Sequence, residues 1–226
     1  MNRRALLTSA IAAVCAPATR AWSHALEPAP VSGFELPVPR GVRPFVLRTH
    51  AGAPFSEKDL QGRWSFLFFG FTQCPDVCPA TLAELHQVRL ALDSARDAVP
   101  SAILFVTIDP ARDTEPRLKE YVERFDPEIT GLRSTSGATR RFAEQFRVRY
   151  EIAGASGEPK SDYRFDHTAS VSLIGPDARL YAIYTLPLRP STVAGDVVRI
   201  HAKYRAALCP AVSGRGKSRT CTGRTA

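Results

Sequence analysis

This sequence lacks several features that would argue against an ordinary globular domain. It contains no internal repeat and no low-complexity tract, and its body does not have the composition of a disordered chain. Its N-terminal apolar stretch, Ala5–Ala18, is far shorter than the ~20 residues that span a bilayer. A chain of 226 residues with ample apolar content instead fits one domain with short appendages.

Acidic residues are absent from the C-terminal end, so the net charge of the whole chain does not describe the charge of its central part. Residues 201–226 carry six basic side chains and no acidic one, and residues 1–27 have a net charge of +2. Because the whole chain has a formal charge of +8, residues 28–200 are balanced, and no basic face for nucleic acid is expected. The basic tail, residues 209–226, is expected to be a solvated, disordered end, with an anionic membrane or an acidic partner as the alternative.

The first 25 residues are expected to be an export signal rather than part of the fold. Arg3 and Arg4 precede the apolar stretch, and small residues suited to cleavage follow it. An ordinary secretory signal explains this pattern, and the adjacent arginines followed by two leucines also resemble a twin-arginine signal. We therefore expect an exported, periplasmic protein, which an uncleaved signal would attach to the membrane.

Two cysteines lie where a buried strand is expected to lead into a helix. The apolar run Trp64–Phe71 predicts a strand buried on both faces, and apolar residues at helical spacing follow from Ala80. Cys74 and Cys78 lie between them, at a helix N-terminus whose free N–H groups and partial positive charge favour thiolates. Their spacing of four places both sulfurs on one side of the first turn if the helix begins near Pro75.

Two close thiolates can form a disulfide or hold a soft metal ion, but they need a further ligand to complete a metal site. His167 opens another apolar run far along the chain and is a candidate third ligand. Two thiolates and one imidazole suit copper or zinc, and thiolate softness favours Cu(I). The alternatives are a structural disulfide, which export favours, and a histidine that is merely a satisfied polar residue.

Strand and helix patterns alternate along the rest of the chain. Strands are expected at 45–49, 102–108, 129–134, 168–174 and 180–185, helices from the Thr114 cap, from Ser136 and at 191–208, a capped turn at Ser56–Asp59, and a hairpin-like excursion around residues 153–162. This order predicts an α/β fold with a mixed sheet. The proline-rich residues 26–44 are expected to be an irregular lead-in to a domain at 45–208.

Three strings resemble the SCO/SenC family: FGFTQCPDVCPATLAEL, VTIDPARDTEPRLKEY and DHTASVSLIGPDARL, in this order. The resemblance extends roughly from Phe34 to Ala207. It implies a thioredoxin-like fold, in which helices flank a mixed central sheet and the hairpin-like insertion precedes the loop that carries His167. It also implies that Cys74, Cys78 and His167 bind copper, as Cu(I) and/or Cu(II), in assembly of the CuA centre of cytochrome c oxidase.

The resemblance favours a copper metallochaperone, expected to be a monomer, whose partner is cytochrome c oxidase subunit II or another copper protein. The alternative is a thiol–disulfide reductase, in which Cys74 and Cys78 are a redox-active pair that acts on partner cysteines and a thiol reductant restores it. The pair lacks the two-residue spacing of thioredoxins, which weakens this alternative. The two roles are compatible, because the CuA cysteines must be reduced before they bind metal.

Three acidic residues have an ordinary structural interpretation beside a functional one. Asp166 either orients the imidazole of His167 or only ends a strand. Asp109 and Asp113 match the Asp-Pro-x-Arg-Asp string of the family, which implies a place on the rim of the site or on a partner surface. Turn formation is the default interpretation of both.

The remaining histidines and cysteines are expected to lie outside the site. His86 and His201 are expected at the surface. Cys209 and Cys221 fall outside the resemblance and are expected to form a terminal disulfide once exported. The alternative for these two cysteines is a second, weak copper site, since thiols bind Cu(I).

Overall fold

The structure, a computed structural model, describes residues 33–153, 164–167 and 169–208, and of residues 152–153 and 164–167 it describes the backbone alone. The expected export signal, the basic tail and the Cys209–Cys221 disulfide lie outside these ranges. None of the helices in the described part of the chain is both long and apolar enough to cross a membrane.

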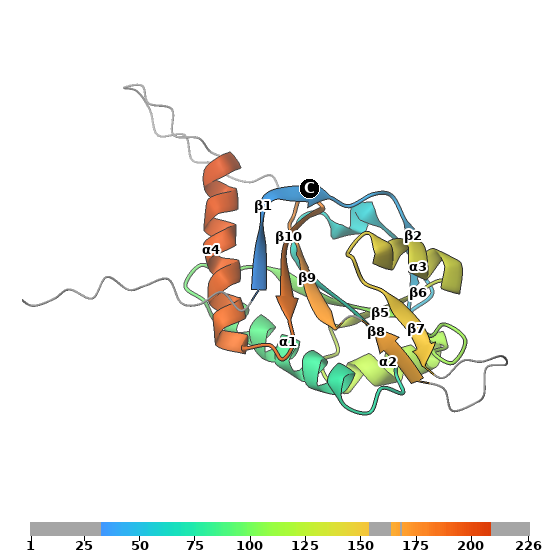
Figure 1. Ribbon diagram of the computed structural model, residues 1–226. Coiled ribbons are helices and arrows are strands. Elements are labelled where there is room, and N and C mark those ends of the chain that lie inside the picture. Colours follow the sequence, from blue (N-terminus) through green and yellow to red (C-terminus); the bar gives the residue numbers. More distant parts are fainter. Residues whose placement is uncertain (1–32, 154–163, 168, 209–226) are drawn as a thin grey trace, which may run out of the picture.

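A mixed sheet of eight strands, in the order β1-β10-β9-β4-β5-β6-β2-β3, forms the centre of the described chain (Figure 1). Its middle strands β4, β5 and β6 run parallel, while β9 pairs antiparallel with β4. The bounds are β1 Gly33–Gly41, β2 Val46–Thr49, β3 Pro54–Ser56, β4 Trp64–Gly70, β5 Ser101–Thr107, β6 Thr130–Arg133, β9 Ser170–Ile174 and β10 Arg179–Thr185. The predicted α/β fold with a mixed sheet is confirmed.

Helices cover both faces of this sheet, and accordingly the central strand is apolar except for the buried Ser65. The helices are α1 Val77–Asp93, α2 Glu115–Glu123, α3 Ser136–Glu144 and α4 Pro190–Leu208, with the 3-10 turn η1 Glu57–Leu60. Phe66 and Phe68 of β4 belong to one core cluster with α1, α2 and α4, whereas Leu67 and Phe69 belong to another with α3 and η1. Every residue of β4 is therefore buried.

The predicted helix starts agree with the caps that the structure contains. The Thr114 side chain accepts a hydrogen bond from the Arg117 backbone at the start of α2, and Ser56 and Asp59 form a reciprocal capping box at η1. The hairpin-like excursion is also confirmed, but the expected loop that carries His167 after it is wrong, because His167 is the last residue of one of its strands. Strands β7 Tyr150–Ala153 and β8 Arg164–His167 form a separate antiparallel pair (Figure 1).

The expected irregular lead-in is wrong for Gly33–Gly41, which forms the edge strand β1 against β10. Pro37 and Pro39 lack the N–H group that a regular ladder needs, and they fall where the β1–β10 register shifts, between Glu35 and Arg40. The strand is fixed by a contact far along the chain. The Glu35 carboxylate lies 2.7 Å from Arg199 and 2.9 Å from Lys203, both on α4.

Candidate metal centre

The end of β4 is shaped so that a sulfur atom can approach the backbone. A Cβ atom at Gly70 would lie 2.7 Å from Cys78 Sγ and 2.8 Å from Cε2 of Phe105. Any side chain here would push the sulfur or the ring away, so glycine is required by close approach. The strand thus ends where the Cys78 thiol packs against it.

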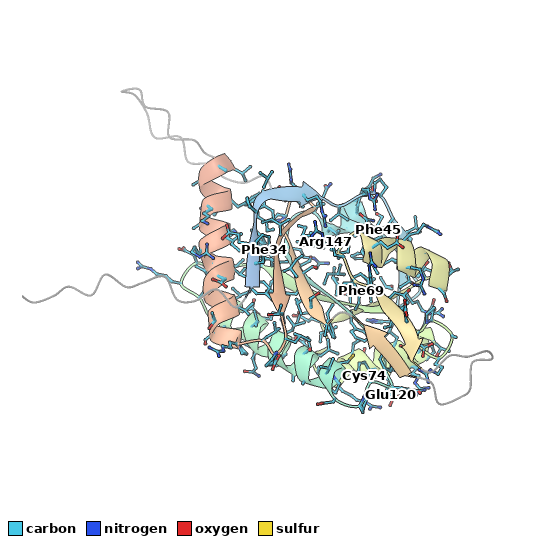
Figure 2. The ribbon with its side chains drawn as sticks, in the orientation of Figure 1. Phe34, Phe45, Phe69, Cys74, Glu120 and Arg147 are labelled. Atoms are coloured by element: carbon cyan, nitrogen blue, oxygen red, sulfur yellow. The ribbon has the colours of Figure 1, made fainter. Side chains whose placement is uncertain are left out.

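The two cysteines meet in the turn from β4 to α1, where Figure 2 labels Cys74. Neither cysteine forms a disulfide in the described part of the chain; Cys78 is fully buried, while Cys74 is half-buried. The Cys78 backbone N–H donates to Cys74 Sγ at 3.4 Å, and the N-cap residue Asp76 makes no side-chain cap bond. The Cys74 sulfur therefore takes the place of the capping group at the N-terminus of α1.

The expectation that the helix N-terminus favours a thiolate is wrong for Cys78. Its pKa is raised because it forms a side-chain hydrogen bond with Cys74, because burial removes water, and because charge on Cys74 would lie beside it. Two neighbouring thiolates in such a place repel each other unless a cation lies between them. The metal-free pair is therefore not doubly charged at neutral pH.

Asp113 anchors the loop that carries Cys74. Its fully buried carboxylate accepts hydrogen bonds from the Thr72 backbone at 3.0 Å, from the Thr72 hydroxyl at 2.5 Å and from the Thr107 hydroxyl at 2.5 Å. Burial raises the pKa of Asp113, and the bonds from the two threonines oppose that rise. The default interpretation of Asp113 as a turn former is therefore incomplete: it also fixes the start of the cysteine loop to the end of β5.

Asp109 and Arg133 support the same loop. Asp109 is buried, forms an ion pair with Arg112, and accepts the Asp113 N–H through its backbone oxygen at 2.9 Å. The Arg133 guanidinium donates to the backbone oxygens of Asp113 and Pro110 at 3.1 and 2.9 Å. These contacts make the loop after β5 a rigid support beside the cysteine turn.

The prediction that His86 and His201 lie at the surface is wrong, because each is partly buried with a partner. His86 Nδ1 lies 2.9 Å from Oδ2 of Asp126, a buried carboxylate that also binds Arg89. His201 Nδ1 accepts the indole N–H of Trp64 at 2.9 Å. A buried carboxylate and a buried indole both need such partners, which the linear sequence does not reveal.

The structure places the backbone of His167 but not its side chain. His167 ends β8, where it pairs in register with Tyr150 of β7, and Asp166 pairs with Glu151. Tyr150 is buried in the core cluster against which Cys74 also packs. Among the described side chains, which exclude those of 152–168, no group of three or more His, Cys, Asp or Glu is placed to hold a metal ion. Of the three predicted ligands, the structure therefore shows two, Cys74 and Cys78, to lie together.

Comparison with known proteins relates the chain to copper-binding proteins. A family model described as SCO1/SenC matches residues 36–202. The mitochondrial protein SCO1 homolog of Homo sapiens is 37% identical over 162 residues, which cover 72% of this chain and 53% of that protein. Mitochondrial protein SCO2 of Saccharomyces cerevisiae is 38% identical over 136 residues, or 60% of this chain and 44% of that protein. The chain thus spans about half the length of these curated relatives.

Solved structures are similar over most of the described domain. Arabidopsis thaliana ScoI with copper bound is 31% identical with a TM-score of 0.66, covering 72% of this chain and 98% of that one. Yeast Sco1 with copper bound is 32% identical with a TM-score of 0.66, covering 75% of this chain and 94% of that one. The expected thioredoxin-like fold, with its mixed central sheet flanked by helices, is confirmed.

Proposed function

The chain belongs to the SCO1/SenC family, and from that premise we propose that it is a copper metallochaperone for cytochrome c oxidase assembly. In this proposal one copper ion is bound by Cys74, Cys78 and His167 and is delivered to, or used to prepare, the CuA site of oxidase subunit II or another copper protein. The observation that carries the proposal is that Cys74 and Cys78 lie together, as thiols rather than a disulfide, at the start of α1.

The donor set fits copper as the cargo. The raised pKa of Cys78 keeps the metal-free pair from becoming doubly charged, and a bound cation supplies the positive charge that lets both sulfurs ionise. Thiolates select soft ions such as Cu(I), and an added imidazole also suits Cu(II). Copper binding would therefore release protons from the pair.

The unequal burial of the two sulfurs suits transfer to a partner. Cys78 is closed off beneath Gly70 and Phe105, whereas Cys74 is half-buried in the turn. A partner cysteine can therefore approach the metal from the Cys74 side and replace one ligand at a time. Transfer by stepwise ligand exchange never leaves the ion without sulfur ligands.

The register of the hairpin supports His167 as the third ligand. Its backbone lies opposite Tyr150, and Tyr150 and Cys74 pack in the same core cluster. A ligand at the end of β8 is therefore carried by a strand whose partner packs in the same core cluster as Cys74, which supports the proposal. We assign Asp166, its neighbour in sequence, no role in binding the ion.

The proposed cellular location and partners of the protein rest on its sequence and its relatives together. The human and yeast relatives are mitochondrial proteins, and the export signal expected at residues 1–25 would send this chain to the periplasm. We propose that it acts there as a monomer, with membrane contact through an uncleaved signal or the basic tail. Because residues 28–200 are balanced in charge, nucleic acid is not a proposed partner.

Copper titration of the reduced full-length protein tests this proposal. The parent is expected to bind one copper ion tightly, whereas His167→Ala loses tight stoichiometric binding but keeps two titratable thiols at the site. His86→Ala is the matched control, because it removes an imidazole that pairs with Asp126 rather than with a cysteine. Copper bound by His167→Ala as tightly as by the parent would rule out the three-ligand site.

The second candidate function is a thiol–disulfide reductase, which the half-exposed Cys74 beside the buried Cys78 favours. The Cys74 thiolate would attack a partner disulfide and release one partner thiolate. Cys78 would then form the Cys74–Cys78 disulfide and release the second, so that two electrons pass to the partner and a thiol reductant restores the pair. Rapid disulfide reduction that is retained in His167→Ala, together with unchanged copper binding, would favour this function.

A further inference from the structure

Two arginines face each other across neighbouring strands and share one carboxylate. Arg48 of β2 and Arg133 of β6 are directly opposite in the antiparallel register, an arrangement in which like charges repel. The shared carboxylate is that of Glu115 on α2, whose Oε1 lies 3.5 Å from Arg48 Nε and 3.9 Å from Arg133 Nη1. Both distances exceed that of a good hydrogen bond. The arginine pair therefore has one excess positive charge, and its single counter-charge is loosely held.

The arginine pair lines a surface cleft of about 500 Å³. Pro110, Ala111 and Ser136 form part of its wall, and none of the lining residues in the described chain is acidic. The hydroxyl of Thr135 accepts the Ala138 N–H as the cap of α3, so the helix end beside the cleft already has a polar partner. The two guanidinium groups therefore determine what the cleft can bind, and they suit an anion.

Both guanidinium groups are already ordered by backbone oxygens. Arg133 donates through Nε and Nη2 to Asp113 and Pro110 at 3.1 and 2.9 Å. Arg48 donates through Nη2 to the backbone oxygen of Gly52 at 2.6 Å, while its side chain is 59% exposed. Ordered arginine forks lose little conformational entropy when they bind a carboxylate, and such preorganisation strengthens binding.

The cleft lies at the same edge of the sheet as the cysteine turn. Strands β4, β5 and β6 are parallel neighbours, so the turn with Cys74, the loop with Pro110 and the last residue of β6, Arg133, follow their carboxyl ends. Neighbouring strands are ~4.8 Å apart, which separates the ends of β4 and β6 by about 10 Å. A protein–protein interface covers about 800 Å² on each partner, so a protein that reaches Cys74 can also cover the arginine pair.

We propose that Arg48 and Arg133 form a docking site for a carboxylate side chain of the protein that receives the copper ion. An acidic surface of this partner covers the cleft while its cysteines reach Cys74, and its carboxylate replaces the loose contact with Glu115. Charge complementarity supports this occupant, because arginine forks bind carboxylates through paired N–H bonds. The inference rests on the proposed copper function, which supplies the identity of the partner.

The measurement is the dissociation constant of the reduced, copper-free full-length protein for the soluble CuA domain of oxidase subunit II, at low and at higher salt. At low salt, Arg48→Ala is expected to weaken binding about tenfold, and the salt dependence is expected to become smaller. Arg48→Lys keeps the charge but loses the fork, so its affinity is expected to lie between those of Arg48→Ala and the parent. Glu115→Gln is expected to strengthen binding, because it removes the competing carboxylate.

Arg63→Ala and Asp97→Asn are the matched controls for the changes in charge. Arg63 directly precedes β4 and Asp97 lies in the connection before β5, so both exposed residues are at the amino ends of these strands, away from the cysteine turn. Each is expected to bind the domain within about twofold of the parent, because charges beyond a Debye length of about 10 Å are largely screened. Thermal unfolding checks that every variant is folded, and Glu115→Gln keeps the test decisive if Arg48→Ala is not.

The outcomes separate this inference from the copper function. Binding by folded Arg48→Ala within twofold of the parent overturns the inference, as does an equal loss in Arg63→Ala or a parent that does not bind the domain. Copper titration of the same proteins reports on the copper function alone, because Arg48 holds no metal and Arg48→Ala is expected to bind copper as tightly as the parent. Weaker docking of Arg48→Ala beside a parent that binds no copper would keep the docking site and overturn the copper function.

Discussion

At the scale of single residues, the site depends on how closely Cys78 Sγ approaches the end of β4. Gly70 makes that approach feasible, and both the sulfur and the Phe105 ring lie against the space beside it. The Cys74 sulfur accepts the N–H group of Cys78 and is half-buried, whereas Cys78 is fully buried. The two sulfurs therefore differ in access although they lie in one turn.

Replacing Gly70 with alanine is expected to destabilise the protein by about 1–3 kcal/mol, because the new Cβ must displace the sulfur or the ring. Copper binding is expected to weaken as well, since Cys78 moves. The measurements are urea unfolding of the apo protein and a competitive copper titration. The control is Gly41→Ala, where a Cβ meets nothing within 4 Å. Equal stability of Gly70→Ala and Gly41→Ala would contradict this account of the strand end.

Residues of the site differ in how far the sequence alone predicts them. Cys74 and Cys78 were predictable because their spacing and their place between strand and helix are local features. The role of Asp113 was not, because its partners lie on two separate segments. His167 remains a prediction that rests on the resemblance and on the register of β8.

At the scale of elements, Asp113 joins two segments that build the site. It fixes the turn after β4, through Thr72, to the last residue of β5, Thr107. The neighbouring strands are parallel, so their carboxyl ends lie at the same edge of the sheet. One buried carboxylate is therefore enough to hold the cysteine turn to the loop beside it.

Asp113→Asn is expected to destabilise the fold by about 1–3 kcal/mol, because an amide replaces one acceptor oxygen with a donor that faces N–H and O–H groups. Hydrogen exchange of the Thr72 amide is expected to become faster, since its acceptor is lost or weakened. The exposed Asp97→Asn serves as the control. Unchanged exchange at Thr72 in Asp113→Asn would show that the carboxylate does not anchor this turn.

Elements with strong local patterns were predictable, and the edge strand was not. β4 is a dense apolar run, and α2 has a side-chain cap at Thr114, so both could be placed from sequence. β1 contains two prolines and depends on the contact of Glu35 with Arg199, which joins residues far apart in the chain. The proline content of this segment therefore predicted an irregular structure, whereas its tertiary contacts hold it as a strand.

At the scale of the whole molecule, the candidate site lies at one edge of the sheet. Helices cover both faces of the sheet. The carboxyl ends of β4 and β5 meet at that edge, as is common for binding sites in α/β proteins. The β7–β8 hairpin is the one pair of strands outside the main sheet in the described chain, and it carries His167. The account predicts that this hairpin and the cysteine turn act on a single ion.

X-ray absorption at the copper edge of the loaded protein tests that claim most directly. The account predicts two sulfur ligands together with the multiple-scattering pattern of one imidazole, and loss of that pattern in His167→Ala with both sulfurs retained. A spectrum that shows a single sulfur, or an imidazole pattern that persists in His167→Ala, would contradict it.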